Sequence, residues 1–216
     1  MKVVVPVSGG LDSTVLLALA LSDRHEVYPL FLDLGQRARR WEYGAVRQIG
    51  SWYRLSAKRL RFRDYGRMVG LPSLRPKTYE EAFVPDRDTL VASVATAYAM
   101  SLGAEQVWHG TVGSDAYGNT DADYLLALGE AVRIGNEGYN PPRHLAPFLW
   151  WSKPDVISVG EKLGAPFHLT WTCWDNRRPV CLECPKCESR TVAFRKAGAQ
   201  DPVAPGKTTP NVWWGY

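Results

Sequence analysis

Two groups of residues near opposite ends of the chain could do chemistry. The first follows a β-branched run over 3–7 and reads Ser8-Gly9-Gly10-Leu11-Asp12-Ser13-Thr14. Two adjacent glycines allow a sharp turn in which backbone N–H groups approach a ligand closely. The apolar residues that follow predict a helix, and the N-terminus of a helix attracts anions, most often phosphate. The segment is a candidate phosphate-binding loop, and an ordinary turn between a strand and a helix is the alternative.

Four cysteines form the second group. Cys173, Cys181, Cys184 and Cys187 have the spacing C-x7-C-x2-C-x2-C. In a reducing compartment, clustered thiols indicate a metal site rather than disulfides. Four thiolates suit tetrahedral Zn²⁺ and leave no ligand position for water, so we expect a structural zinc site. An iron–sulfur cluster and a redox-active thiol pair are the alternatives.

Length and composition narrow the class of protein. The 216 residues carry a net charge of +4 and are 45% hydrophobic, enough for one large domain with a full core. No run approaches the ~20 apolar residues that a membrane span needs, and too few residues precede Ser8 for a signal peptide. We therefore expect a cytoplasmic protein with no membrane partner. The mild positive charge fits a nucleotide and does not require a nucleic-acid partner.

The elements that must position these groups alternate along the chain. Apolar runs predict strands over 3–7, 26–32, 58–62 and 106–109. Helical spacing and capping residues predict helices over 15–21, 37–53, 89–102, 121–132 and 152–163. Asp121 is the expected cap of the fourth helix, and Ser152 with Asp155 has the spacing of a capping box. The stretches 70–88, 111–120 and 135–147 are expected to be loops or irregular.

Such alternation is typical of an α/β fold with a doubly wound, mainly parallel sheet, which binds ligands at the carboxyl ends of its strands. Gly35, after the second expected strand, and Gly110, after the fourth, mark turns at those ends. The basic residues between 54 and 67 are expected to form a solvated face. None of the four histidines is spaced as a metal ligand; His109, beside Gly110, is the candidate for substrate contact.

Five motifs together resemble the 7-cyano-7-deazaguanine synthase family of the N-type ATP pyrophosphatases, the PP-loop superfamily. They are Ser8-Gly9-Gly10-Leu11-Asp12-Ser13, Asp33-Leu34-Gly35-Gln36-Arg37, Val84-Pro85-Asp86-Arg87-Asp88, Ser152-Lys153 and Leu169-Thr170-Trp171-Thr172-Cys173. The first motif indicates only the superfamily, whereas the cysteine spacing behind Thr-Trp-x-Cys is more specific. The resemblance implies an ATP-binding α/β domain over 1–168, a zinc loop with a following helix over 169–200, and an extended tail over 201–216.

The resemblance also implies a reaction. ATP would activate 7-carboxy-7-deazaguanine as an acyl adenylate with release of pyrophosphate, and ammonia would displace AMP to give an amide. A second activation would dehydrate the amide to the nitrile. Mg²⁺ would bridge the phosphates with Asp12 as a candidate ligand, and the flat deazapurine would stack on Trp171 or Trp174. Relatives of this kind suggest a homodimer.

Matching the motifs residue by residue gives the expected site. The catalytic candidates are Asp12, Ser13, Arg87 and Lys153. The candidates for binding ATP are Val7, Ser8, Gly9, Gly10, Leu11, Asp12, Ser13, Thr14, Leu32, Asp33, Gly35, Gln36, Arg37 and Gly110.

The chain departs from the family pattern on the substrate side. The family usually has Val-Pro-x-Arg-Asn with a small residue at x, where this chain has Asp86 and Asp88. An expected arginine further on is Asp123. Added carboxylates weaken binding of a carboxylate unless something compensates for them. Two further readings therefore stand: a divergent ligase that forms an amide from another carboxylate or amine, and a non-catalytic binder of nucleotide or nucleic acid.

Overall fold

The computed structural model describes residues 1–71, 75–113, 122–176 and 179–203. Its centre is a parallel sheet in the order β3-β2-β1-β4-β5, with strands β1 (Lys2–Pro6), β2 (Glu26–Asp33), β3 (Lys58–Arg61), β4 (Gln106–Trp108) and β5 (Arg143–Leu145). The expectation of an α/β fold with a doubly wound, mainly parallel sheet is confirmed. From β1 the chain first adds strands on one side of the sheet (β2, β3) and then on the other (β4, β5). Folds of this type bind ligands in a crevice at this switch point, between β1 and β4.

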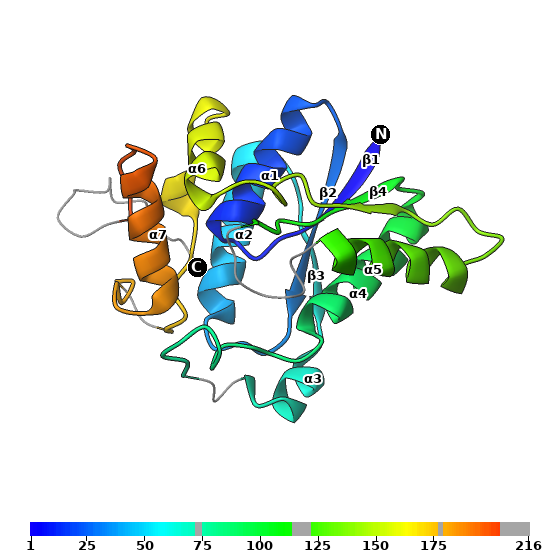
Figure 1. Ribbon diagram of the computed structural model, residues 1–216, viewed down its shortest axis with the longest axis horizontal. Coiled ribbons are helices and arrows are strands. Elements are labelled where there is room, and N and C mark those ends of the chain that lie inside the picture. The colour runs from blue at the N-terminus through cyan, green and yellow to red at the C-terminus, as the bar shows by residue number, and fades with distance from the viewer. Residues whose placement is uncertain (72–74, 114–121, 177–178, 204–216) are drawn as a thin grey trace.

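Helices cover both faces of the sheet (Figure 1). On one face lie α1 (Leu11–Ser22), α2 (Arg39–Tyr53), α6 (Lys153–Lys162) and α7 (Pro185–Lys196). On the other lie α3 (Arg63–Met68), α4 (Arg87–Leu102) and α5 (Ala122–Gly135). A short 3₁₀ helix, η3 (Phe167–Leu169), follows α6.

Alternating side chains of β1 explain the two layers. Val3 and Val5 pack into the core beneath α1, whereas Val4 packs into a second core with Ala95 and Ala99 of α4. All three valines are fully buried, because a parallel strand in the middle of a sheet is covered on both faces. The cysteine segment shares the first core through Cys173 and other buried residues. The division into the expected parts 1–168, 169–200 and 201–216 stays a prediction.

Three short elements were not predicted: β5, α3 and the 3₁₀ helix η3. β5 lies within 135–147, which was expected to be irregular, and α3 begins directly after β3. The capping box of α6 is present: Ser152 N donates to Asp155 Oδ2 at 2.9 Å and Asp155 N donates to Ser152 Oγ at 3.4 Å. The expected cap Asp121, most of the loop 111–120 and the tail beyond residue 203 lie outside the described residues.

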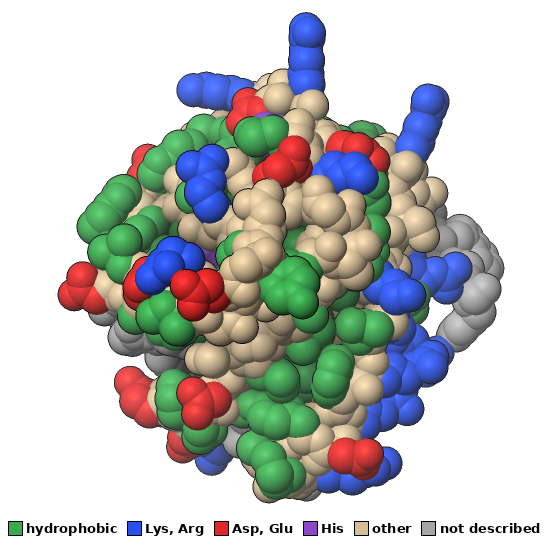
Figure 2. All heavy atoms as spheres, turned by 90° about the vertical axis from the view of Figure 1, so that its right-hand side faces the viewer, with side chains coloured by type: hydrophobic (Ala, Val, Ile, Leu, Met, Phe, Trp, Pro, Cys, Tyr) green, Lys and Arg blue, Asp and Glu red, His purple; other side chains and the backbone are tan. Residues whose placement is uncertain are grey.

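Within the described ranges, no helix is both long and apolar enough to cross a membrane. Figure 2 shows the side of the molecule that carries α5, where apolar side chains gather in adjoining groups. The large exposed apolar side chains there include Leu126 and Ile134 of α5.

Candidate functional site

The loop between β1 and α1 is built around a glycine that no other residue could replace cheaply. Gly9 has φ +76°, and a Cβ on it would come within 2.5 Å of the Glu42 carbonyl oxygen in α2. The Gly9 carbonyl accepts a hydrogen bond from Trp171 N at 2.8 Å. The loop is therefore wedged between α2 and the segment that leads into the cysteine cluster.

The first turn of α1 opens toward a cavity. The first helical hydrogen bond runs from Thr14 N to Gly10 O at 3.2 Å, so the N–H groups of the residues just before Thr14 have no helical partner. The Ser8 and Ser13 hydroxyl oxygens lie 3.5 Å apart beside this turn. Unpaired N–H groups and hydroxyls at a helix N-terminus can hold an anion.

A lysine from α6 reaches this turn. Lys153 Nζ lies 2.9 Å from Asp12 Oδ2, and both side chains are largely buried. Lys153 is the first residue of α6, directly after the Ser152 cap, so the capping box fixes where its side chain starts. The other carboxylate oxygen, Asp12 Oδ1, is buried and finds no hydrogen-bond partner within the described part of the chain.

The cavity has a volume of about 460 Å³ and lies at the carboxyl ends of β1, β2 and β4. All four catalytic candidates, Asp12, Ser13, Arg87 and Lys153, line it. So do these candidates for binding ATP: Val7, Ser8, Gly10, Leu11, Leu32, Gln36, Arg37 and Gly110. Gly9, Thr14, Asp33 and Gly35 are not among the lining residues. Thr14 is buried and its hydroxyl donates to Gly10 O at 2.7 Å.

Asp33, at the end of β2, is fully buried and pairs with two arginines of the basic segment 54–67. It accepts hydrogen bonds from Arg59 at 2.6 Å and from Arg63 at 2.9 Å. Burial raises the pKa of Asp33, but the hydrogen bonds from Arg63, Arg59 and Gly35 N–H outweigh it and hold that pKa below its ordinary value. The expectation of a solvated basic face over 54–67 is thus wrong for Arg59, which is largely buried, whereas Arg63 stays exposed while it pairs with Asp33.

Gln36 and Arg37, which follow β2, connect the cavity to other segments of the protein. Gln36 Nε2 donates to Glu42 Oε2 at 2.7 Å, and burial raises the pKa of Glu42 to about 7 despite that hydrogen bond and the charge of Arg87. Arg37 Nη2 lies 2.9 Å from Asp175 Oδ1, two residues after the first cysteine of the cluster. Glu42 lines the cavity, and no motif in the sequence points to it.

On the opposite wall, Arg87 and Asp88 form an ion pair with Arg87 Nε 3.0 Å from Asp88 Oδ1. His109, at the end of β4, also lines the cavity. Its Nε2 lies 2.8 Å from His144 Nδ1 in β5, and His144 Nε2 lies 3.0 Å from Thr96 Oγ1 in α4. Burial lowers the pKa of both histidines to about 4, so both are neutral at neutral pH.

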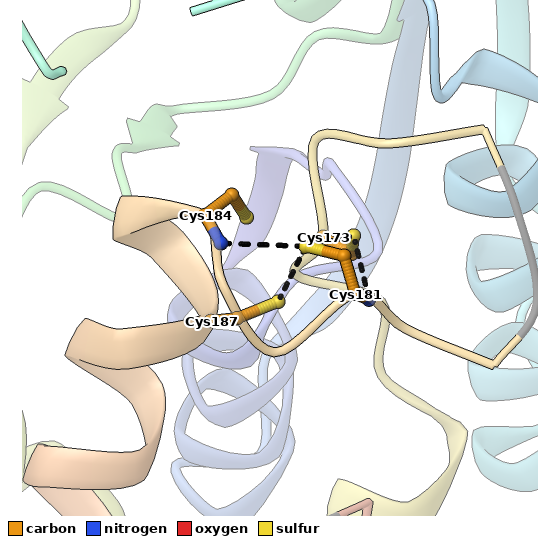
Figure 3. A group of neighbouring side chains, drawn as sticks. All are labelled: Cys173, Cys181, Cys184 and Cys187. Carbon is orange, nitrogen blue, oxygen red and sulfur yellow. Dashed lines mark hydrogen bonds between the residues drawn. The ribbon is translucent and has the colours of Figure 1, made fainter. Parts of the chain in front are cut away.

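The four cysteine side chains point toward one another (Figure 3). Their sulfur atoms all lie within 4.8 Å of one another, with Cys173 and Cys181 at 3.4 Å and Cys181 and Cys187 at 3.9 Å. Tetrahedral zinc with Zn–S bonds of about 2.3 Å needs sulfur atoms about 3.8 Å apart. The cluster therefore has the size and donor set for one metal ion.

Backbone N–H groups support this cluster. Asp175 N donates to Cys173 Sγ at 3.3 Å, Cys181 N to the same sulfur at 3.4 Å and Cys184 N to Cys181 Sγ at 3.3 Å. Hydrogen bonds from the thiols of Cys173 and Cys187 lower the pKa of the Cys184 thiol. Donors of this kind stabilise thiolates and orient metal ligands.

The cysteine segment also forms one wall of the cavity. Trp171 lies on its edge, but it is 5% exposed, stacks on Trp41 with ring centroids 5.3 Å apart and donates its Nε1–H to Cys173 O. Trp174 lines the cavity and meets Tyr79 edge-on at 5.6 Å. Of the two tryptophans expected to stack on a ligand, Trp174 is thus the less enclosed by the protein.

Helix α7 adds residues that sequence reasoning missed. Lys186, Ser189 and Arg190 line the cavity from α7; Lys186 lies between Cys184 and Cys187, and the other two follow the last cysteine. Arg190 is buried and pairs with Asp201, with Nε 2.8 Å from Oδ2. Its Nη1 also donates to Thr170 Oγ1 at 2.6 Å. The available signal was their closeness in sequence to Cys187, which follows Lys186 directly and precedes Arg190 by about one helical turn.

Comparisons with known proteins agree with this geometry. The family described as "Queuosine biosynthesis protein QueC" matches residues 2–198. A "7-cyano-7-deazaguanine synthase" of Thermoplasma volcanium is 35% identical over 94% of this chain and 90% of its own, and one of Oceanobacillus iheyensis is 31% identical over 94% and 97%.

A solved structure shares the fold alone. The "U34-tRNA thiolase NcsA from Methanococcus maripaludis with its [4Fe-4S] cluster" superposes with a TM-score of 0.56 at 16% identity, covering 91% of this chain and 67% of its own. Together with the match over residues 2–198, the full-length relatives above 30% identity establish the family. This chain is a member of the QueC family of queuosine biosynthesis proteins.

Proposed function

We propose that this protein converts 7-carboxy-7-deazaguanine and ammonia to 7-cyano-7-deazaguanine at the expense of ATP, through an adenylated carboxylate. The observation that carries the proposal is the meeting of Lys153 and Asp12 over the open first turn of α1, inside one cavity. That arrangement suits pyrophosphate release, and the relatives that bear this activity in their names match nearly the whole chain.

The loop after β1 is the proposed site of the ATP phosphates. Its N–H groups and the Ser8 and Ser13 hydroxyls would hold the β- and γ-phosphates as they leave together as pyrophosphate. The nucleoside would follow the end of β2 past Leu32 and Gln36, both of which line the cavity. Gly9, Thr14, Asp33 and Gly35 act indirectly in this proposal, by shaping the loop and the turn rather than by touching ATP.

Cationic groups would neutralise the charge of the two anions that must approach each other. Lys153 and Arg87 stand on different walls of the cavity and are the proposed partners of phosphate and carboxylate. The buried Asp12 Oδ1, which lacks a protein partner in the described ranges, fits a ligand of Mg²⁺. Bound there, Mg²⁺ supplies charge neutralisation to the phosphates.

The reaction then proceeds by two activations. A carboxylate oxygen of the deazapurine attacks the α-phosphorus of ATP and pyrophosphate leaves. Ammonia attacks the acyl carbon, AMP leaves and a proton is lost, which gives the amide. The amide oxygen attacks the α-phosphorus of a second ATP and pyrophosphate leaves; departure of AMP with loss of the two N–H protons then gives the nitrile. Trp174 is the proposed aromatic wall for the flat ring, since it lines the cavity beside the cysteine segment, and Tyr79 packs edge-on against it.

Zinc is the proposed occupant of the four-cysteine site. Sulfur atoms within 4.8 Å of one another suit a single tetrahedral ion. An iron–sulfur cube binds its four cysteines through four separate iron atoms and needs a wider set. A zinc ion would fix the segment that contributes Trp174 and, through the pair of Asp175 with Arg37, the loop after β2. Four thiolates in a metal site require reduced thiols, which supports a cytoplasmic location.

The test is an assay of purified protein with ATP, Mg²⁺, ammonium and 7-carboxy-7-deazaguanine, read by mass spectrometry. We expect a product of the nitrile's mass together with AMP and pyrophosphate. The variant Lys153→Ala serves as the matched negative control, because it lacks the cation over the loop. Absence of any deazapurine product from the wild type, with the protein folded, would overturn the proposal.

A second candidate is a ligase of the same chemistry that stops at an amide or uses another carboxylate or amine. The ion pair of Arg87 with Asp88 favours it, because the pair lowers the positive charge available to a carboxylate substrate. Asp86, in a left-handed conformation at the start of α4, and Asp123, in the first turn of α5, are the sequence neighbours of Arg87 and Tyr124, which line the cavity. AMP formation with the amide as the end product would select this candidate in the same assay.

A homodimer is the proposed assembly. Leu126 and Ile134 of α5 are 71% and 59% exposed, and they lie eight residues apart, which places them on one side of the helix. Light scattering should report twice the chain mass, and Leu126→Glu should shift it toward the monomer. Arg133→Ala, on the same helix, is the control. A wild-type protein that scatters as a monomer would contradict this assembly.

A further inference from the structure

Two histidines and a threonine form a hydrogen-bonded chain that starts at the cavity and runs into the protein. His109, directly after β4, lines the cavity, His144 of β5 lies behind it, and the buried Thr96 of α4 ends the chain. The two N···N and N···O distances are 2.8 and 3.0 Å, and the two rings stack with centroids 5.0 Å apart. No motif of the family resemblance contains any of these three residues.

The protein end of the chain fixes where the protons are. The Thr96 hydroxyl donates its one hydrogen to the Ala92 carbonyl at 2.9 Å, so toward His144 it can only accept. His144 Nε2 must therefore carry a proton and donate it to Thr96. A neutral imidazole has one N–H, so His144 Nδ1 is a bare acceptor.

The bare Nδ1 of His144 decides which nitrogen of His109 carries a proton. Since His144 Nδ1 accepts, His109 Nε2 must be the donor in the 2.8 Å contact. The remaining nitrogen of His109, Nδ1, then carries a lone pair and makes no hydrogen bond within the described part of the chain. The tautomer of a histidine is set by the hydrogen bond of its other nitrogen in this way.

Both rings stay neutral at neutral pH, which the argument requires. Burial and, after it, the neighbouring His144 lower the pKa of His109 to about 4, although the charge of Asp88 acts in the opposite direction. Burial alone lowers the pKa of His144 to about 4. A protonated pair would place two N–H groups face to face at 2.8 Å and break the chain.

The position of His109 shows which part of the ligand it can meet. The next residue, Gly110, stands against the first turn of α1, since a Cβ on it would lie 3.5 Å from Ser13 N. His109 therefore borders the region where the activated carboxyl group would lie beside the phosphates. This step rests on the proposed function.

We infer that His109 is a specificity-determining residue that accepts a hydrogen bond at Nδ1 from an N–H group of the ligand, and that His144 and Thr96 act as positioning residues that hold it in this tautomer. The N–H donor is either the ammonia that attacks the acyl carbon or the ring and amino N–H groups of the deazapurine. A neutral nitrogen lone pair can accept a hydrogen bond from ammonia or from ammonium, but it rejects a ligand that presents a carbonyl or carboxylate oxygen there, because two lone pairs would face each other.

Substitutions at His109 separate the two nitrogens. The carbonyl oxygen of asparagine can take the place of Nδ1, whereas the side chain of glutamine reaches the place of Nε2. We expect His109→Gln to raise KM roughly tenfold, the loss of one hydrogen bond, and His109→Asn to stay within about threefold of wild type. The substrate whose KM rises, ammonium or 7-carboxy-7-deazaguanine, identifies the donor, while KM for ATP stays unchanged. Equal kinetics of His109→Gln and the wild type would overturn the inference.

The tautomer itself is measured independently of turnover. Long-range ¹⁵N–¹H correlation spectra should show Nε2 protonated and Nδ1 bare in both His109 and His144. Thr96→Val should abolish this preference in His144 and raise the same KM, whereas Thr96→Ser should keep both. A protonated Nδ1 in His109 would overturn the inference even if the enzyme is active. The wild type could form no deazapurine product and still show the expected tautomer. In that case the proposed function fails, but the hydrogen-bond acceptor at His109 Nδ1 remains. Calorimetry of 7-carboxy-7-deazaguanine binding to the wild type and to His109→Gln would then test the acceptor.

Discussion

Lys153 Nζ lies 2.9 Å from Asp12 Oδ2, although 141 residues separate the two in the chain. The contact joins the start of α6 to the first turn of α1, and α1 and α6 pack against each other along one face of the sheet. Both side chains line the cavity. The pair thus brings a cation to a helix N-terminus that is itself suited to anions, and Asp12 holds that cation in place when no phosphate is bound.

Replacing the lysine tests whether this cation serves the reaction. Lys153→Ala should lower the rate of ATP turnover by about 100-fold or more, the usual cost of removing one group that stabilises developing negative charge. Lys162→Ala is the matched control, because Lys162 is an exposed lysine in the last turn of the same helix. The measurement is the rate of pyrophosphate release at saturating ATP, compared between Lys153→Ala and Lys162→Ala. Equal rates for Lys153→Ala and the control would remove Lys153 from the site.

The loop residues Asp12 and Ser13 make a second prediction. Asp12→Ala and Ser13→Ala should both abolish ATP turnover, since the first removes a candidate Mg²⁺ ligand and the second a hydroxyl beside the phosphates. Asp12→Asn, which keeps the shape, should raise the Mg²⁺ concentration needed for half-maximal rate. The exposed Asp23, just after α1, gives the control Asp23→Asn. Unchanged turnover in Asp12→Ala and Ser13→Ala would refute the assignment of the loop to ATP.

The parts of this site that the sequence predicted depend on local chemistry. Gly9 has a positive φ and packs against α2, a conformation and a contact that favour glycine. Ser152 and Asp155 cap α6, and a cap of this kind needs short polar side chains. Such requirements appear as short motifs. The cysteine spacing is local in the same sense, because Cys184 and Cys187 lie at the cap and in the first turn of α7.

The parts that were missed depend on which strands become neighbours. β5 has three residues, Arg143–Leu145, and pairs with β4, which places His144 beside His109 across 35 positions. Likewise, Arg59 and Arg63 become partners of Asp33 only because β3 runs beside β2. A short strand of mixed polarity shows no hydrophobic periodicity, and a cation that faces the protein interior shows none either. A single sequence therefore does not reveal them. These contacts follow from topology rather than from spacing.

Removing one cysteine should release the zinc ion and lower the stability of the folded protein. Cys184→Ser should lower bound zinc from about one per chain to near zero, because a tetrahedral site tolerates loss of a thiolate poorly. A cost on the order of 3 kcal/mol would lower Tm by roughly 6–12 °C in a chain of this size. Metal analysis and thermal unfolding measure the two effects. Wild-type protein without zinc would refute the zinc assignment, and bound iron would favour a cluster.

Glu42 gives a prediction about pH. Burial raises its pKa from 4.5 to about 7, so between these values the folded state holds a proton that the unfolded state has lost. The folded protein must therefore lose stability as pH rises from about 4.5 to 7, and the loss is complete above that range. Each unit of pKa shift corresponds to about 1.4 kcal/mol, and because Glu42 faces the cavity we expect about half of the full penalty.

Glu42→Gln keeps a side chain of the same shape beside Gln36 and removes the ionisable group. Its Tm should exceed that of the wild type by several degrees at pH 8 and by little at pH 5, where the wild-type carboxyl is already protonated. Glu161→Gln, an exposed site on α6, should change Tm equally little at both values. A Tm difference between Glu42→Gln and the wild type that stays constant from pH 5 to 8 would mean that Glu42 titrates near its ordinary pKa, and that the charge beside the phosphate loop is a permanent carboxylate.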